Sequence, residues 1–300
     1  MELRQLKTFR VVATLESFNK AALVLNYAQS TVSEQIKSLE NSLGVRLFDR
    51  RNRRISLTPS GEMLLHYAQK MIDIEEEARS EITDHEESRG SLSIRIPETV
   101  STHYLPSILK AFREQYPKVG LNFARCAFHG LQQELASGIV DLAFLLADAS
   151  SVVPDSETET LLKLPLVVVA RAGHPLASQE NVDLQDLIDE PILLPSEDCS
   201  YRVALERMIT GENVDPAVIL NFNSIEAIRR CVTAGIGVTL STEIAMRDDI
   251  KSGRLCVLPW TGEQVEANLQ MIWHKSKWIS PILQAFMETV RNCVSTPDAG

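Results

Sequence analysis

The sequence lacks any apolar run of the roughly 18 residues that a membrane-spanning helix needs. The first residues also lack the pattern of a secretory signal, because they contain Glu2 and Glu16 and no long apolar core. We therefore expect a cytoplasmic protein with no membrane partner. The 300 residues are 44% hydrophobic and 23% charged, which is ordinary for a globular chain and long enough for two or more domains.

Ligand sets for metals and disulfide frameworks are also missing. Cysteine occurs five times, an odd number at wide spacing, and the six histidines are scattered without ligand spacing. The chain has no nucleophile elbow, zinc-protease motif or phosphate-binding loop. Glycines in the segment 233–238 lie between a helical and a strand pattern, the reverse of a dinucleotide fingerprint. We expect no cofactor and no metal, and an α/β enzyme remains an alternative on fold class alone.

The net charge of -10 is distributed unevenly. Residues 1–61 carry 10 basic and 5 acidic side chains, whereas residues 62–89 carry 3 basic and 9 acidic ones. A basic head on an acidic body indicates an anionic polymer as the partner of one end only. From charge alone, an equally weighted alternative is a basic face that only keeps the domain soluble.

The head predicts three short helices. Apolar residues recur at helical spacing over 3–13, and Ser17 can cap a second helix whose inward residues lie within 18–25. Ser30 is the expected cap of a third helix. The inward stripe and terminating glycine of that helix are Val32, Ile36, Leu39, Leu43 and Gly44. Two short helices joined by a tight turn predict a helix-turn-helix.

The third helix carries short polar groups on its leading face, namely Gln29, Ser30, Thr31, Ser33, Glu34 and Lys37. The N-terminal part of such a helix meets base edges in the major groove. Glutamine pairs with adenine there, and Lys37 reaches phosphate or guanine. Glu34 either accepts from a cytosine amino group or points to solvent, and we favour solvent because most charges on a helix are solvated.

Two alternating runs, 45–48 and 54–58, flank a polar turn and predict a hairpin, or wing. The wing carries four arginines: Arg50, Arg51, Arg53 and Arg54. We expect them to bind phosphates or a minor groove with little sequence preference and a strong dependence on salt. The patterned helix would then specify the sequence, and the arginines would hold double-stranded DNA.

The segment 59–89 predicts one long helix. Pro59 is suited to its first turn, apolar residues follow at steps of three or four, and the other faces are strongly acidic. A narrow apolar stripe suits a coiled-coil seam, and a helix packed on its own body is the alternative. We favour dimerisation, because two-fold proteins bind two half-sites of DNA.

The body alternates strand and helix patterns, which indicates a parallel α/β fold, with a second unit beginning at Leu164. Ligands of such folds lie at the carboxyl ends of strands, beside helix N-termini. Three junctions have this form: 99–102, 196–202 and 223–224. The serines there are equally explained as plain helix caps, but three junctions on two lobes favour a small-molecule pocket.

The N-terminal 61 residues resemble the winged helix-turn-helix of LysR-type transcriptional regulators. The matching stretches are SFNKAALVLN, AQSTVSEQIKSLENSLGVRLFDR and LTPSGE, and the likeness continues over essentially the whole chain. The resemblance implies three parts: a DNA-binding domain at 1–58, a linker or dimerisation helix at 59–89, and an α/β effector domain at 90–300. The effector domain would be two-lobed and similar to periplasmic binding proteins. Lobe I would take about 90–163 and 267–300, and lobe II about 164–266.

The resemblance also implies partners. They are promoter DNA, a small-molecule effector, further copies of the chain in a dimer that assembles to a homotetramer, and RNA polymerase. It implies that the protein is not an enzyme. A soluble ligand-binding protein without DNA function is a weaker alternative, and the arginine wing counts against it.

Three loops of the effector domain match the effector-contacting loops of the family. Their residues are Thr99, Ser101 and Thr102, then Cys199, Ser200, Tyr201 and Arg202, and finally Asn223 and Ser224. Arg202 is the expected contact for a carboxylate or other anion, with a salt bridge to a neighbouring acid as the alternative.

Cys199 supports a second hypothesis, a redox-sensing regulator. It lies about where peroxide-sensing members of the family carry a reactive cysteine, and a helix N-terminus with Arg202 nearby favours thiolate. Against this, no second cysteine is close in the chain, since the next one, Cys231, follows 32 residues later.

Overall fold

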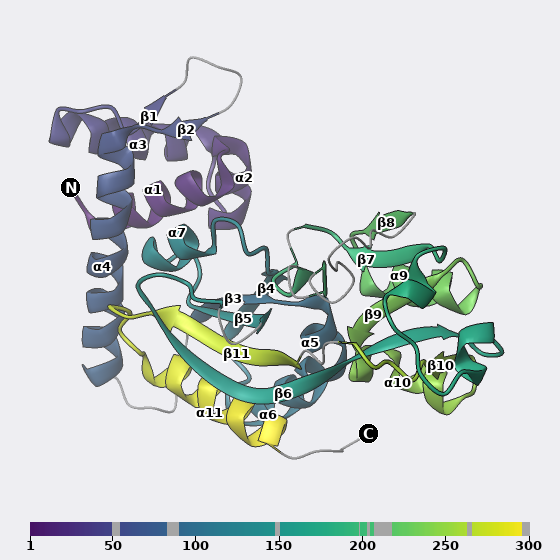
Figure 1. Cartoon of the computed structure of the whole chain (residues 1–300). Coiled ribbons are helices and arrows are strands. Elements are labelled where there is room, and N and C mark those ends of the chain that lie inside the picture. The colour runs from purple at the N-terminus through teal and green to yellow at the C-terminus, as the bar shows by residue number, and fades with distance from the viewer. Residues whose placement is uncertain are drawn as a thin grey trace.

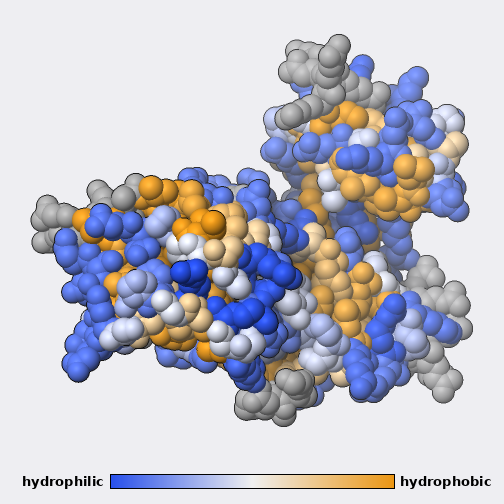
Figure 2. Space-filling model, turned by 90° about the vertical axis from the view of Figure 1, so that its right-hand side faces the viewer, coloured by the Kyte–Doolittle hydropathy of each residue, from blue (hydrophilic) through white to orange (hydrophobic). Residues whose placement is uncertain are grey.

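The computed structural model describes residues 1–49, 55–82, 90–147, 151–197, 199–202, 205–206, 218–262 and 266–295. Figure 1 shows a small helical unit at the N-terminus, a long helix that descends from it, and a body built on one wide sheet. In the space-filling view the N-terminal unit projects from the body (Figure 2). The two units therefore present separate surfaces.

Three short helices build the N-terminal unit: α1 (Leu3–Leu15), α2 (Phe18–Leu25) and α3 (Gln29–Leu43). Their inward side chains share one core with the first half of α4 (Pro59–Ile82). The core contains Leu6, Phe9, Val12, Ala21, Ala22, Val32, Ile36, Leu39, Leu47, Phe48, Leu65, Ala68 and Ile72. The helices predicted from apolar periodicity are thus confirmed.

The ends of these helices agree only in part with the sequence pattern. Ser17 caps α2 by accepting a hydrogen bond from the Lys20 amide at 3.3 Å. Gly44 ends α3 in the left-handed conformation, with φ of 71°. The prediction that Ser30 caps α3 is wrong, because the carbonyl of Ala28 already accepts the first helical bond, from the amide of Val32 at 3.2 Å. Ser30 therefore lies inside the first turn.

The wing begins as an antiparallel pair of two-residue strands, β1 (Phe48–Asp49) and β2 (Ser56–Leu57). These strands are shorter than the alternating runs that predicted them. The four wing arginines, Arg50, Arg51, Arg53 and Arg54, lie outside the described residues.

The long helix α4 starts where the proline predicts. The Thr58 hydroxyl accepts from the amide of Gly61 at 3.1 Å, which caps the first turn. The 24 residues of α4 extend over about 36 Å at 1.5 Å per residue. None of the helices in the described ranges is both long enough and apolar enough to cross a bilayer.

Among the described residues of the body, nine strands form one sheet in the order β4-β3-β5-β11-β6-β9-β7-β8, with β10 added to β6. Its strands are β3 (Ser91–Ile96), β4 (Gly120–Arg125), β5 (Leu142–Ala147), β6 (Ser156–Arg171), β7 (Ile192–Pro195), β8 (Ile219–Phe222), β9 (Val238–Thr242), β10 (Leu255–Val257) and β11 (Glu266–His274). We call β3, β4, β5 and β11 with their helices lobe I, and β7 to β10 with theirs lobe II.

The 16-residue strand β6 belongs to both lobes. Its first part pairs with β11, from Ser156 to Pro165, and its last part pairs with β9 and β10, from Leu166 to Arg171. β6 thus begins eight residues before Leu164, where the pattern placed the start of the second unit, and the chain enters lobe II without leaving the sheet (Figure 1).

Helices cover both faces of lobe I. On one face lie α5 (Glu98–His103), α6 (Leu105–Gln115) and α11 (Pro281–Ser295), and on the other lies α7 (Leu131–Ala136). Strand β5 is buried throughout because its alternate side chains enter the two cores: Leu142, Phe144 and Leu146 one, Ala143, Leu145 and Ala147 the other. In lobe II, α9 (Ile225–Thr233) and α10 (Glu243–Lys251) cover one face in the same way.

Candidate functional site

The polar face of α3 is at the surface. Gln29, Ser30, Glu34 and Lys37 are exposed, whereas Thr31 and Ser33 are half-buried. Gln29 donates to the Ser33 hydroxyl at 2.9 Å. The opposite side of α3 is buried in the core of the N-terminal unit, so the helix presents one polar face and hides one apolar face.

Buried polar contacts hold α3 against its neighbours. The side chains of Thr8 and Gln35 are hydrogen-bonded at 2.7 Å, which fixes α3 on α1. The buried carboxylate of Glu40 accepts from the amides of Leu47 and Phe48, at 2.9 and 3.4 Å. That second contact ties the end of α3 to the base of the wing, so helix and wing keep one relative position.

Helix α4 has two apolar faces. Leu65, Ala68 and Ile72 are buried in the N-terminal unit. A second set of apolar side chains is exposed: Met63, Tyr67, Met71 and Ile74. At about 100° per residue, the second set lies within an arc of about 80°, centred roughly 140° from the first. Within this exposed set, Tyr67 has an edge-on ring contact with the neighbouring His66, with centroids 5.5 Å apart.

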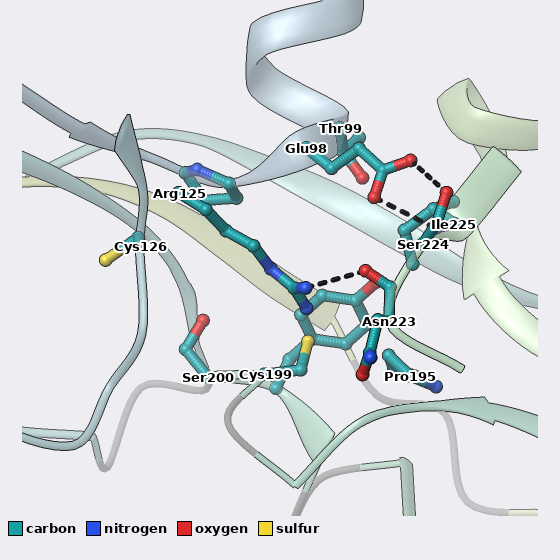
Figure 3. Close-up of a pocket in the computed structure, with 12 residues that line it drawn as sticks. Glu98, Thr99, Arg125, Cys126, Pro195, Cys199, Ser200, Asn223, Ser224 and Ile225 are labelled. Carbon is teal, nitrogen blue, oxygen red and sulfur yellow. Dashed lines mark hydrogen bonds between the residues drawn. The ribbon is translucent and has the colours of Figure 1, made fainter. Parts of the chain in front are cut away.

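The two lobes flank a small, partly open pocket with a cavity volume of about 30 Å³, which we call the cleft pocket. Lobe I contributes Pro97, Glu98, Thr99, Arg125 and Cys126, and lobe II contributes Pro195, Cys199, Ser200, Tyr201, Asn223, Ser224 and Ile225 (Figure 3). Thr99, Cys199, Ser200, Tyr201, Asn223 and Ser224 were expected from the sequence. All three predicted loops therefore meet here.

Three predicted residues lie elsewhere. Thr102 lines a neighbouring cavity beyond Glu98, and Ser101 turns its hydroxyl back to the carbonyl of Glu98 at 2.8 Å. Arg202 is buried beneath the pocket and is not among its lining residues. Its guanidinium donates to the carboxylate of Glu206 at 2.8 Å, to the side chain of Asn221 at 2.8 Å, and to the Pro195 carbonyl. The alternative interpretation, a salt bridge, describes this arrangement.

A different arginine reaches into the cleft pocket. Arg125, the last residue of β4, donates to the Asn223 carbonyl at 2.6 Å and to the Ser196 hydroxyl at 3.3 Å. It is exposed, and it makes no ion pair with an acidic side chain of the described residues. Arg125 was not among the predicted site residues, although the carboxyl end of a parallel strand is where a ligand-binding residue is expected.

Glu98 is a second pocket residue that no sequence pattern indicated. Its carboxylate accepts from the Ser224 hydroxyl at 2.9 Å and from the amides of Ile225 and Glu226 at 3.0 and 3.1 Å (Figure 3). Ser224 is at the same time the N-cap of α9, accepting from the amide of Ala227 at 3.3 Å. The pocket thus holds a carboxylate and a guanidinium that both reach from lobe I to the start of α9.

Two cysteines line the pocket, although they are far apart in the chain. Burial raises the pKa of the Cys199 thiol to about 11 and that of Cys126 to about 12. Figure 3 shows their sulfur atoms on separate sides of the pocket. Both thiols are therefore protonated at neutral pH, which does not favour the reactive thiolate that a redox sensor needs.

The sequence matches two family descriptions. Residues 3–62 match "Bacterial regulatory helix-turn-helix protein, lysR family", and residues 85–294 match "LysR substrate binding domain". Among curated proteins, the uncharacterized HTH-type transcriptional regulator YwqM of Bacillus subtilis is 38% identical over 97% of this chain and 99% of its own length. The regulator GltR of the same organism is 32% identical over 97% of each chain.

Solved structures agree on the fold. Full-length OxyR C199D from Pseudomonas aeruginosa superposes with a TM-score of 0.75 at 23% identity, covering 98% of this chain and 94% of its own. At that identity the likeness concerns the fold alone, so it adds nothing to the redox hypothesis. HinK, a LysR family transcriptional regulator from the same organism, has a TM-score of 0.59 at 27% identity and covers 98% of each chain.

Proposed function

The chain belongs to the LysR family of transcriptional regulators, and from that premise we propose which residues bind DNA and which bind the effector. DNA binding is assigned to the polar face of α3, placed in the major groove. The wing arginines, Arg50, Arg51, Arg53 and Arg54, hold the flanking backbone. The exposure of the α3 face and its rigid attachment through Thr8 and Glu40 support this assignment.

Fluorescence anisotropy with DNA fragments from upstream of the gene tests this assignment. Lys37→Ala should weaken DNA binding about tenfold. The slope of log affinity against log salt concentration should fall in magnitude by about one, because each phosphate contact releases about one counterion. Lys110→Ala, which removes an exposed lysine of α6, is the control. Equal binding by the two variants would remove Lys37 from the interface. A loss of affinity in Arg53→Ala and Arg54→Ala tests the wing in the same assay.

Promoter binding is assigned to a homo-oligomer. The exposed apolar face of α4 is suited to pair with the same face of a second copy, which buries it. Such a dimer places two α3 helices for two half-sites, and two dimers form the proposed tetramer. The protein acts in the cytoplasm, with the DNA, and at a promoter RNA polymerase is the further partner that we propose.

The cleft pocket is assigned to a small anionic effector. The observation that carries this assignment is the Arg125 guanidinium, which opens to the pocket and whose partners among the described residues are neutral oxygens, those of Asn223 and Ser196. An arginine binds a carboxylate in a bidentate, charge-assisted manner that a carbonyl does not match. Arg202 instead supports the pocket from below, since its donors are bound within lobe II.

A thermal-shift screen tests the effector assignment. Small carboxylates are compared with the neutral amides of the same skeletons, and any carboxylate that stabilises the protein is retested on variants. Arg125→Ala should abolish the shift and Arg125→Lys should retain part of it. Arg171→Ala, which changes an exposed arginine at the end of β6 outside the pocket, is the control. A ligand that binds Arg125→Ala as well as the unchanged protein would refute the assignment.

A further inference from the structure

Glu98 connects the two lobes across the cleft pocket. It is the first residue of α5 in lobe I, yet its carboxylate binds the start of α9 in lobe II, more than 120 positions later in the chain. Both carboxylate oxygens take part: one accepts from the Ser224 hydroxyl and the Glu226 amide, the other from the Ile225 amide. The contact is thus bidentate, as for a bound carboxylate ligand.

The start of α9 is chemically suited to a carboxylate. The first amides of a helix have no intrahelical partner, and the aligned peptide dipoles place partial positive charge there. The helix has nine residues, and its own cap, Ser224, already satisfies the amide of Ala227. Glu98 is therefore an added anion on amides that the local sequence leaves free.

The same junction is bound by Arg125 from the other side. The Asn223 carbonyl, one residue before the cap, accepts from Arg125 at 2.6 Å. Lobe I thus binds the β8–α9 junction with a carboxylate and a guanidinium at adjacent residues (Figure 3). In this arrangement an anion that enters the pocket finds the Arg125 charge available and the α9 amides already occupied.

We propose that Glu98 is a built-in carboxylate ligand of the effector pocket, which occupies the α9 amides until an effector carboxylate displaces it. The competition between effector and Glu98 rests on the anionic effector proposed above, whereas the occupancy by Glu98 does not. Displacement removes the Glu98 contact and leaves the Arg125 contact between lobe I and the β8–α9 junction. Effector binding is thereby converted into a change in how the lobes are joined.

Hydrogen exchange of the α9 amides in the full-length protein tests this proposal without DNA or effector. The amides of Ile225 and Glu226 should exchange slowly in the unchanged protein and about tenfold faster or more in Glu98→Ala, because the variant removes the charged acceptor of both amides. Glu114→Ala, which removes an exposed glutamate of α6, is the control. Glu98→Gln keeps the shape of the side chain without its charge and should show an intermediate rate.

Acetate supplies the missing carboxylate as a free ligand. In Glu98→Ala, sodium acetate at a few hundred millimolar should slow the exchange of these two amides, whereas sodium chloride at equal ionic strength should not. Acetate should have little effect on the unchanged protein, where Glu98 holds the position. This difference between the two proteins is the expected signature of an internal competitor.

Two results would overturn the proposal. Equal exchange in Glu98→Ala, Glu98→Gln and the unchanged protein would mean that the carboxylate does not hold α9 in solution. Fast exchange that acetate cannot slow would mean that the contact is only a structural link. Neither result depends on Arg125. If the anionic effector assignment is wrong, this appears in a different experiment, in which carboxylates bind the Arg125→Ala variant as well as the unchanged protein.

Discussion

Ile74 provides a quantitative test of the pairing of α4 helices. Its side chain is 62% exposed on the second apolar face of the helix, away from the core of the N-terminal unit. We predict that Ile74→Ala weakens the dimer without unfolding the chain. The buried face of α4, which includes Ile72, is untouched by this change.

The expected size follows from the exposed area. Isoleucine to alanine removes three carbon groups, and each contributes about 0.8 kcal/mol when it is fully buried. Only the exposed 62% can be newly buried in a dimer, which leaves about 1.5 kcal/mol per chain. A two-fold interface contains the residue twice, so about 3 kcal/mol is lost, and the dissociation constant of the dimer should rise about 100-fold.

Sedimentation equilibrium over a range of protein concentrations measures this constant. Val152→Ala is the matched control, since Val152 is 72% exposed and lies in lobe I away from α4. It should leave the constant unchanged, and circular dichroism should show the same helix content in both variants. If Ile74→Ala dimerises within twofold of the unchanged protein, the exposed face of α4 is not the dimer interface.

Further predictions concern the effector domain. Arg202→Met should lower the free energy of unfolding by about 1–3 kcal/mol in urea titrations, because it leaves buried acceptors without donors. If the variant is as stable as the unchanged protein and has lost only its effector response, Arg202 binds the effector after all. Cys199, whose pKa is raised from 9.0 to about 11, should be alkylated about 100-fold more slowly at pH 8 than an unperturbed thiol, with the rate rising until the pH passes about 11. A fast reaction at pH 8 would reopen the redox hypothesis. Gly138 of lobe I has φ of 66°, and a methyl group added there would lie 2.0 Å from the side chain of Gln69 in α4. Gly138→Ala should therefore loosen α4 from lobe I, which faster hydrogen exchange around Gln69 would show. Unchanged exchange would mean that α4 does not need the contact between Gln69 and Gly138.

The sequence predicted the N-terminal unit better than the body, for a physical reason. Helices with one buried face repeat apolar residues every three or four positions, and this repeat identified α3. Val32, Ile36 and Leu39 of the predicted stripe are buried, but the prediction for Leu43 is wrong, because it lies in the last turn and is 38% exposed. The cap of α3 was misplaced at Ser30, because a side chain suited to capping does not show where the first helical bond forms. In the body, α10 and β10 gave no signal that we recognised.

The cleft pocket was predicted as three loops but not as a set of charges. A contact between Glu98 and Ser224 depends on two elements 126 positions apart, and no local pattern records it. Arg202 and Arg125 are equally charged in the sequence, and only the fold shows that Arg202 is buried with acceptors while Arg125 opens into the pocket. Burial likewise decides the state of Cys199, since a raised pKa follows from its surroundings.

The strand that belongs to both lobes limits how they can move. A hinge concentrates a change of backbone angles in a few loop residues. β6 instead runs from Ser156 to Arg171 as one strand, and every residue except Leu161, where the register with β11 shifts, has a strand partner. Turning lobe II against lobe I therefore twists the paired strand β6, which crosses from one lobe to the other between Pro165 and Leu166. A small rotation of the lobes is resisted elastically by many strand hydrogen bonds and not by one loop. A change in the cleft pocket would therefore alter the twist angle between the lobes more than the distance between them.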